Sequence, residues 1–271
     1  MKTDGGHDVA VGKLIFLGTG NSEGIPVPFC MCSVCIGKKV QRWRPSVLIQ
    51  YQDKNYIIDT GPDFREQMLT SGISKLDGVF LTHPHYDHIG GIDDLRAWYI
   101  VTRDSLPLVL SASTYRYLEK SKAHLVLSAT KEEALPAVLE FKILHKLYGE
   151  DIFRDLPYTY LSYYQKSCHV LGYRFGNLAY LTDLARYDRE IFNYLHNVDT
   201  VILSACTEEL PEVFRGRLPS HLTVPQAEAF AEHVGAKHLI ITHIGHNLEE
   251  ERENYPHVVF AYDGMEVSWR I

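Results

Sequence analysis

The side chains best suited to chemistry are gathered in the hexapeptide HPHYDH at positions 83–88. The segment directly follows the apolar run Gly78–Leu81 and precedes Gly90-Gly91, so we expect it on a loop that leaves a strand. Imidazole nitrogens and carboxylate oxygens are ligands that suit zinc, manganese and iron. Such a cluster indicates a metal site far more often than a solvated polar turn. Its candidate ligands are His83, His85, Asp87 and His88.

One loop cannot fill two coordination spheres, so further ligands are expected from other strand ends. Asp183 follows the apolar run Leu178–Leu181 after one threonine, and His243 follows Leu239–Ile241 in the same way. Taken singly, an aspartate or histidine after a strand is more often a cap or turn residue. Beside the hexapeptide, both are predicted to be metal ligands.

A second group of potential ligands is the segment Cys30-x-Cys32-x-x-Cys35. Crowded cysteines in a reducing compartment indicate metal binding before disulfide formation. A closed tetrahedral zinc site needs a fourth ligand, for which His246 is the candidate. The alternative is three reduced thiols in an exposed loop, which would be vulnerable to oxidation.

Short apolar runs bounded by Gly, Asp or Asn predict the strands, and three amphipathic stretches predict helices. The predicted strands are Lys13–Leu17, Val47–Tyr51, Asn55–Ile58, Gly78–Leu81, Leu108–Leu110, Val170–Phe175, Leu178–Leu181, Val201–Leu203, Leu239–Ile241 and Val258–Phe260. The predicted helices are Thr114–Ser121, Asp188–Leu195 and Val224–Val234, the last with Thr223 as N-cap. Strands in two clusters, each followed by helices, favour an α/β fold of two packed sheets with outer helices.

We expect one domain over residues 1–271, in which 122–164 is the segment hardest to interpret. An insertion or a lid over the site is our interpretation of that segment.

Composition narrows the classes of protein. Hydrophobic residues make up 45% and charged residues 23%, which is ordinary soluble usage. The sequence has no apolar run of about 18 residues and no basic, apolar N-terminal leader, so we expect a cytoplasmic protein without a membrane partner. A net charge of −7 argues against a large nucleic-acid partner but allows a small anionic substrate.

The hexapeptide, Asp59-Thr60-Gly61 after a strand, Asp183 and His243 together resemble the ordered motifs of the metallo-β-lactamase superfamily. The resemblance runs from about Leu14 to Val267 and implies a four-layer αββα sandwich of two mixed sheets with outer helices. It also implies two catalytic divalent metals, zinc or manganese, at one edge of the sheets.

The resemblance assigns a role to each residue. One metal would be held by His83 and His85, the other by Asp87, His88 and His243, with Asp183 bridging both. Asp59 would orient a ligand imidazole through its second nitrogen. The simpler interpretation of Asp59 is a turn aspartate before Gly61.

One ligand of the family pattern is missing. The family carries a histidine six or seven residues before the Gly172-Tyr173 pair, where this chain has Gln165 and Lys166. His169 is expected to substitute if its loop bulges inward. The alternative is a weaker first metal shell completed by Gln165 or water.

The cysteine group with His246 resembles the subfamily of cyclic phosphate phosphodiesterases from bacterial phosphonate breakdown. That resemblance implies one structural zinc held by Cys30, Cys32, Cys35 and His246. It places His221 near the catalytic metals, to contact the phosphate or protonate the leaving oxygen. Ahead of a helix, His221 is equally well explained as a residue of the cap region.

The expected reaction is hydrolysis of a small cyclic phosphate ester, with Asp87 and His221 among the catalytic groups. A bound metal lowers the pKa of its water from 15.7 to about 7, so no protein nucleophile is needed. Alternatives are an RNA-processing phosphodiesterase, a thioester hydrolase, or a non-catalytic metal sensor with an eroded site. Association into a homodimer is also left open.

Overall fold

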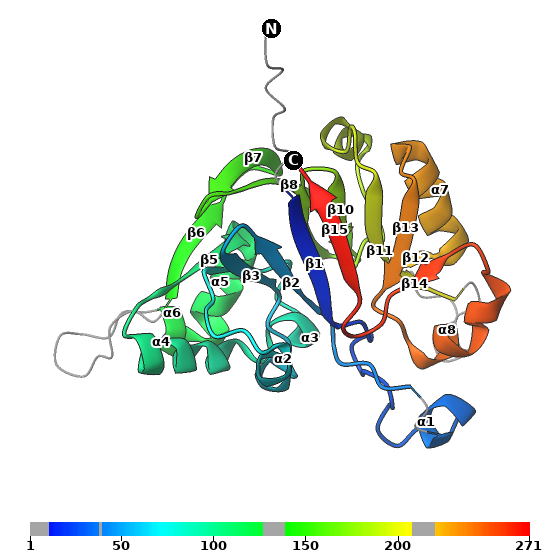
Figure 1. Ribbon diagram of the computed structural model, residues 1–271, viewed down its shortest axis with the longest axis horizontal. Helices are drawn as coiled ribbons and strands as arrows, with labels where there is room; N and C mark the ends of the chain where they lie inside the picture. Colours follow the sequence, from blue (N-terminus) through cyan, green and yellow to red (C-terminus); the bar gives the residue numbers. More distant parts are fainter. Residues whose placement is uncertain (1–10, 38–39, 127–138, 208–219) are drawn as a thin grey trace, which may run out of the picture.

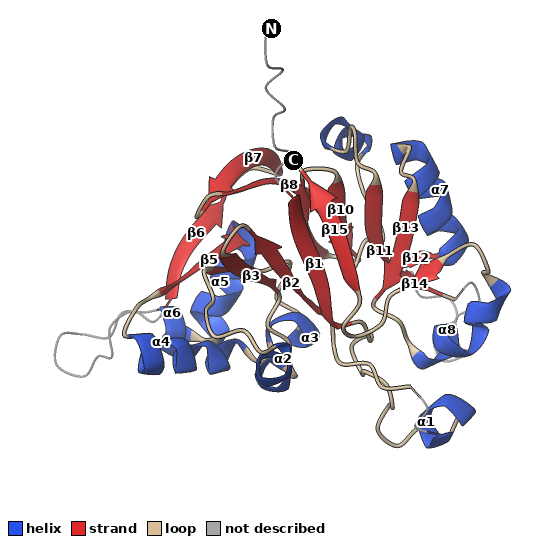
Figure 2. Ribbon diagram, in the orientation of Figure 1, coloured by secondary structure: helices blue, strands red, loops and turns tan. Residues whose placement is uncertain are grey.

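The strands of the computed structural model form two facing sheets (Figures 1 and 2). The structure describes residues 11–37, 40–126, 139–207 and 220–271. In order across the first sheet lie β15 (Glu266–Arg270), β1 (Val11–Gly18), β2 (Ser46–Tyr51), β3 (Lys54–Ile58), β4 (Gly78–Phe80), β5 (Leu106–Ser111) and β6 (Leu139–Leu144). Across the second lie β14 (Val259–Phe260), β13 (His238–Thr242), β11 (Thr200–Cys206), β10 (Leu178–Leu181), β9 (Cys168–Phe175), β8 (Leu156–Gln165) and β7 (Tyr148–Phe153), with β12 (Leu222–Thr223) beside β11.

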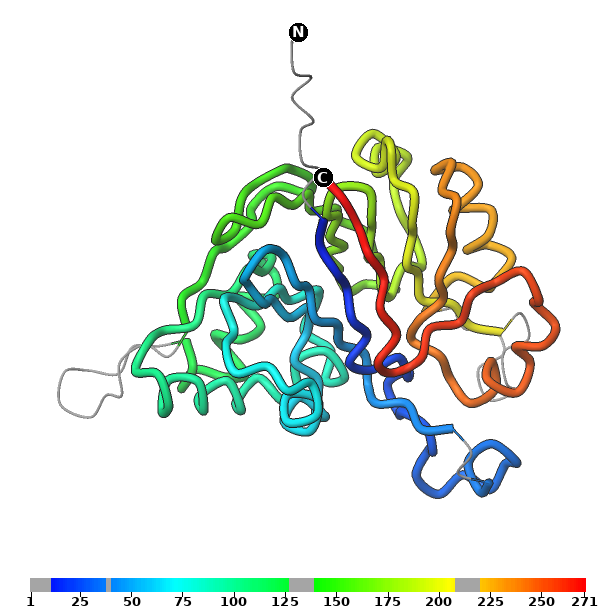
Figure 3. Tube along the Cα trace, in the orientation of Figure 1, coloured from blue at the N-terminus to red at the C-terminus, as the bar shows by residue number. Residues whose placement is uncertain are grey.

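Both sheets are mixed, because each joins a parallel part to an antiparallel part. In the first sheet β3, β4, β5 and β6 run parallel, while β15, β1, β2 and β3 alternate in direction. In the second, β10, β11, β13 and β14 are parallel and β7 to β10 are antiparallel. The first and last strands, β1 and β15, lie side by side in the trace (Figure 3).

Aromatic side chains from both sheets fill the space between them. Phe80 of β4 packs edge-on against Tyr158, Tyr173 and Phe175 of the opposite sheet, with ring centroids 4.9 to 5.7 Å apart. Such pairs contribute about 0.5–1.5 kcal/mol each beyond the burial of their area. The two sheets are therefore held by a continuous core rather than by a few contacts.

Helices cover the outer face of each sheet, completing the αββα sandwich that the resemblance implies. On the first sheet they are α2 (Phe64–Ser71), α3 (Tyr86–Ile89), η1 (Ile92–Leu95), α4 (Arg96–Thr102), α5 (Ala112–Ser121) and α6 (Ala123–Val126). On the second they are η2 (Arg189–Tyr194), α7 (Val224–Val234), α8 (His246–Glu251) and η4 (Arg252–Asn254). The short α1 (Ser33–Gly37) projects from the body on the cysteine segment (Figure 1). None of the helices described is long and apolar enough to cross a bilayer.

Local sequence signals explain where helix α7 begins and ends. Helix α7 has the predicted bounds because Thr223 forms a capping box with Gln226 and Gly235 ends the helix in the left-handed conformation. The predicted helix 188–195 is instead the 3₁₀ helix η2.

The interpretation of 122–164 as an insertion or lid is wrong for its described part. Residues 139–164 form β6, β7 and most of β8, which are regular members of the two sheets, and 127–138 lie outside the described residues. Strand β8 is buried on both faces, so its tyrosine-rich sequence lacks the alternation that marks a half-exposed strand.

The carboxyl ends of the parallel strands β3, β4, β10, β11 and β13 gather at one edge of the sandwich. Two buried tyrosines brace this edge, Tyr173 from one sheet to the other and Tyr163 within the second sheet. The Tyr173 hydroxyl donates to the Leu81 carbonyl at 2.7 Å, and the Tyr163 hydroxyl donates to that of Thr182 at 2.6 Å. This edge is where ligands bind in open α/β sheets, and every predicted strand-end ligand lies on it.

Candidate metal centre

Three of the predicted site residues lie one or two positions past the end of a strand and share an unusual backbone conformation. Asp59, Asp183 and His243 have φ angles of 65°, 58° and 59°, in the left-handed region. Aspartate and histidine enter this region more readily than most residues, at a cost of about 1–3 kcal/mol each. At each of these residues the backbone leaves the strand direction, while the side chain remains at the edge of the sheet.

The side chains of Asp87, His88, Asp183 and His243 converge at that edge. His88 Nε2 lies 3.1 Å from an Asp183 oxygen and 3.3 Å from one of Asp87. His243 Nε2 lies 3.2 Å from the same Asp87 oxygen and 3.6 Å from Asp183. His83 joins His88 and Asp183 in a group whose ligand atoms all lie within 4.8 Å, and its Nε2 is 2.9 Å from His85 Nδ1. The structure thus unites six predicted residues from three strand ends.

The arrangement fits divalent metals on two grounds. Ligands about 2.0–2.2 Å from a tetrahedral zinc lie about 3.3–3.6 Å from one another, close to the separations found here. In addition, burial disfavours a charged imidazole at His88, yet the carboxylates of Asp87, Asp183 and Asp59 raise its pKa well above the ordinary value. The three buried carboxylates therefore favour a positive charge at this position, which metal ions would supply.

Asp59 lies behind the cluster, as the resemblance implies. Its carboxylate accepts a 2.7 Å hydrogen bond from His88 Nδ1. Thr82 holds the same carboxylate through its backbone N–H at 2.8 Å and its hydroxyl at 2.7 Å. The bond fixes the His88 tautomer so that Nε2 faces Asp87 and Asp183, an arrangement typical of metal-binding histidines.

The imidazoles of His83 and His85 are kept neutral and available as ligands. Burial holds the pKa of His83 well below the usual 6.5 and also lowers that of His85. For Asp183, burial acts to raise the pKa, but the nearby imidazoles of His243, His88 and His221 outweigh it and hold the pKa well below its ordinary value. Asp183 is thus an anion in the centre of the site.

His169 does not fill the missing ligand position, so this expectation is corrected. Gln165 pairs with Cys168 across the β8–β9 hairpin, and His169 pairs with Tyr164. Neighbouring residues of a strand point to opposite faces, so His169 and Gln165 are directed apart. Gln165 Nε2 donates to Asp183 at 2.5 Å, whereas His169 Nδ1 lies 3.3 Å from the Ser113 hydroxyl.

His221 lies beside the cluster, and a residue that the sequence reasoning missed positions it. Its Nδ1 is 3.1 Å from the Ser204 hydroxyl and 3.6 Å from Asp183. The same hydroxyl accepts a 2.7 Å hydrogen bond from the backbone N–H of Asp183. Ser204 follows the apolar run Val201–Leu203, so the strand-end pattern that marks Asp183 and His243 also marks it. Burial lowers the pKa of His221 to about 4.

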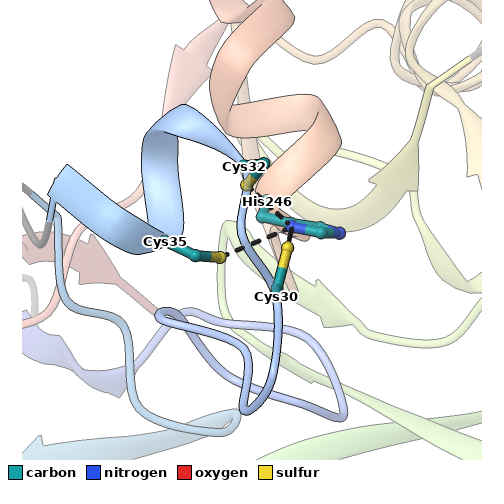
Figure 4. A group of neighbouring side chains, drawn as sticks. All are labelled: Cys30, Cys32, Cys35 and His246. Atoms are coloured by element: carbon teal, nitrogen blue, oxygen red, sulfur yellow. Dashed lines mark hydrogen bonds between the residues drawn. The ribbon is translucent and has the colours of Figure 1, made fainter.

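The second predicted group also assembles, at the base of α8 (Figure 4). The Sγ atoms of Cys30 and Cys32 each lie 3.3 Å from His246 Nδ1, and that of Cys35 lies 3.5 Å from it. A backbone hydrogen bond at Cys35 lowers the pKa of Cys32 to about 6, and burial raises that of Cys35 to about 11. Three sulfurs and one imidazole are the donors of a closed zinc site.

The matching comparisons define the class of this protein. Residues 54–244 match the beta-lactamase superfamily domain, so the chain belongs to that superfamily and has the fold of its metal-dependent hydrolases. It is also similar to the crystal structure of a diphosphatase from the PhnP family, at 31% identity and a TM-score of 0.83. That similarity covers 97% of this chain and 99% of the other, which makes this chain PhnP-like over nearly its whole length.

Two curated relatives match less completely. An octanoyltransferase of Porphyromonas gingivalis is 30% identical over 261 residues, which are 94% of this chain but 51% of the relative. The chain therefore spans about half the length of that protein. A ribonuclease Z of Bradyrhizobium is 35% identical over 85 residues, 31% of this chain and 24% of the relative.

Proposed function

We propose that the protein is a metal-dependent phosphodiesterase that cleaves a small cyclic phosphate ester. The observation that carries the proposal is the presence, in one chain, of a buried His/Asp cluster and a separate group of three cysteines with His246. The similarity of nearly the whole chain to a diphosphatase of the PhnP family supports phosphorus as the reacting centre.

Each residue has a role in this proposal. His83 and His85 would hold one metal, Asp87, His88 and His243 the other, with Asp183 between them. When bound, the metals supply an acidified water and positive charge for the phosphate oxygens. Asp59 keeps His88 in the tautomer that ligates. His221, held by Ser204 at the edge of the cluster, contacts the phosphate or passes a proton to the leaving oxygen.

A diphosphate bond is the second candidate, favoured by the activity named for the PhnP-family structure. Both substrates are small anions whose charge the metals would neutralise. The net charge of −7 and the short ribonuclease Z match make a large RNA substrate less favoured.

The test combines metal analysis with assays of bis-aryl phosphate, cyclic phosphates and nucleoside diphosphates in added manganese or zinc. We expect His85→Ala or Asp183→Asn to lower turnover by at least about 100-fold with the fold intact, since each removes a ligand of the reacting centre. Cys32→Ser is expected chiefly to lower the melting temperature. Equal melting losses in all three variants would contradict the division between catalytic and structural metals. Bound metal without hydrolysis of any phosphate would favour a sensor.

A further inference from the structure

Arg42 lies at the base of the cysteine segment, outside both groups of ligands. Its backbone pairs with that of Ile25 through two 2.9 Å hydrogen bonds, and all three cysteines lie between these two residues in the chain. Its side chain is only 3% exposed. A buried guanidinium must be fully bonded, so its partners indicate what it holds.

Those partners come from three distant parts of the chain. Arg42 Nε and Nη2 lie 2.9 and 2.7 Å from one oxygen of Glu249 in α8, which is also buried. Nη1 donates to the Thr19 hydroxyl at 2.7 Å and to the Ala261 carbonyl. The planar group thereby joins the cysteine segment, α8 and the C-terminal segment in one fixed geometry.

Two of these contacts lead directly to proposed metal ligands. The Thr19 carbonyl accepts a 2.8 Å hydrogen bond from the N–H of Ile244, the residue after His243. Glu249 lies one turn along α8 from His246, which faces the cysteines. The seven residues 243–249 thus carry a ligand of each centre and the carboxylate that Arg42 binds.

We infer that Arg42 is a positioning residue that couples the two centres, fixing His243 and His246 at once through Thr19 and Glu249. The inference rests on the proposed metal sites. A buried ion pair adds little net stability compared with apolar residues of similar size, whereas its geometry is specific. Its main effect is therefore expected on metal binding rather than on folding.

The test uses zinc-containing protein whose His/Asp centre has been emptied by dialysis against EDTA. Arg42→Lys keeps the charge but loses the planar guanidinium that bonds Glu249 and Thr19 at once, so we expect binding of Mn²⁺ to weaken by about 10-fold or more. Release of zinc to a coloured chelator should become faster in the same variant. Arg252→Ala is the matched control, since the half-exposed Arg252 lies 3.1 Å from the other oxygen of Glu249. This variant should change neither the binding of Mn²⁺ nor the release of zinc.

A double variant separates positioning from stability. Arg42→Met with Glu249→Leu removes both buried charges, so the melting temperature should approach that of the wild type while Mn²⁺ binding stays weak. Recovery of Mn²⁺ affinity together with melting temperature would overturn the inference, as would unchanged Mn²⁺ binding and zinc release in Arg42→Lys. If Arg42→Lys does not fold, the double variant decides alone. Failure of the wild type to bind Mn²⁺ would instead refute the proposed function.

Discussion

Gln165 is the residue at which this chain departs most clearly from the family pattern. Its amide contacts Asp183 from the strand position that the family gives to a histidine. A neutral amide is a weaker ligand than imidazole for zinc or manganese. The first metal, assigned to His83 and His85, is therefore expected to bind less tightly than the second.

Replacing this amide tests that expectation. We predict that Gln165→His tightens binding of the first metal on the order of tenfold, because an imidazole would complete its shell. Titration with Mn²⁺, followed by the count of bound ions, measures the change. The control is Lys166→His, which puts the same side chain at the exposed turn beside the strand. Equal effects of the two variants would show that position 165 is not part of the shell.

The residues of the site were predictable to the extent that their signals are local. The hexapeptide needs only neighbours in the sequence, and Asp183 and His243 follow apolar runs that are visible without a structure. The orientation of His169 was not predictable, because it depends on the register of the β8–β9 hairpin, where a shift of one residue reverses the face. Arg42 gave no signal, since its partners are far away in the chain.

At the scale of elements, the short apolar runs bounded by turn residues and the capped helix α7 were predicted, whereas strands β6, β7 and β8 were not. Helix α7 carries its own boundaries in Thr223 and Gly235. Strands β7 and β8 acquire their conformation from pairing with each other and with β9, which no local pattern reports. The mistaken interpretation of 122–164 as an insertion or lid follows from this difference.

Asp199, just before β11, provides a test of how the starts of neighbouring strands are joined. It binds Lys237 before β13 at 2.6 Å and Asn177 before β10 at 2.8 Å. The ammonium of Lys237 and the amide of Asn177 lower the pKa of Asp199 to about 2. Because the folded pKa lies below the unfolded value of about 3.9, this stabilisation is present at neutral pH and is lost as the pH falls toward 2.

We therefore predict that Asp199→Asn lowers the urea midpoint at pH 7, and that the difference from the wild type shrinks between about pH 5 and pH 2. Urea unfolding at a series of pH values measures it. Glu140→Gln serves as the control, since its exposed ion pair with Arg154 is 3.8 Å long, and it should change the midpoint little at any pH. A difference that grows in acid would contradict the prediction.

For the molecule as a whole, the two centres are expected to differ in how they respond to metal removal. The His/Asp cluster lies at a strand edge supported by the aromatic core, so we expect its geometry to survive the removal of metal. The cysteine segment protrudes and exposes Phe29, Met31 and Ile36, so it has little apolar packing to replace its metal.

We predict that EDTA removes two metals per chain and lowers the melting temperature by only a few degrees, whereas a mercurial that blocks the thiols releases the third. Loss of the third metal should open the segment near Phe29 to limited proteolysis. Elemental analysis, calorimetry and mass spectrometry of the fragments measure these outcomes. Cleavage at the same place after EDTA alone would show that the His/Asp metals hold the segment instead.

The left-handed backbone at Asp59, Asp183 and His243 has an evolutionary consequence. Each conformation costs about 1–3 kcal/mol, in a domain whose total stability is about 5–15 kcal/mol. Glycine would adopt the same angles without that cost, but at position 59 it would leave the buried N–H and hydroxyl of Thr82 without their acceptor. Homologues that have abandoned catalysis should therefore accumulate glycine at positions 183 and 243 sooner than at position 59, while keeping the sandwich intact.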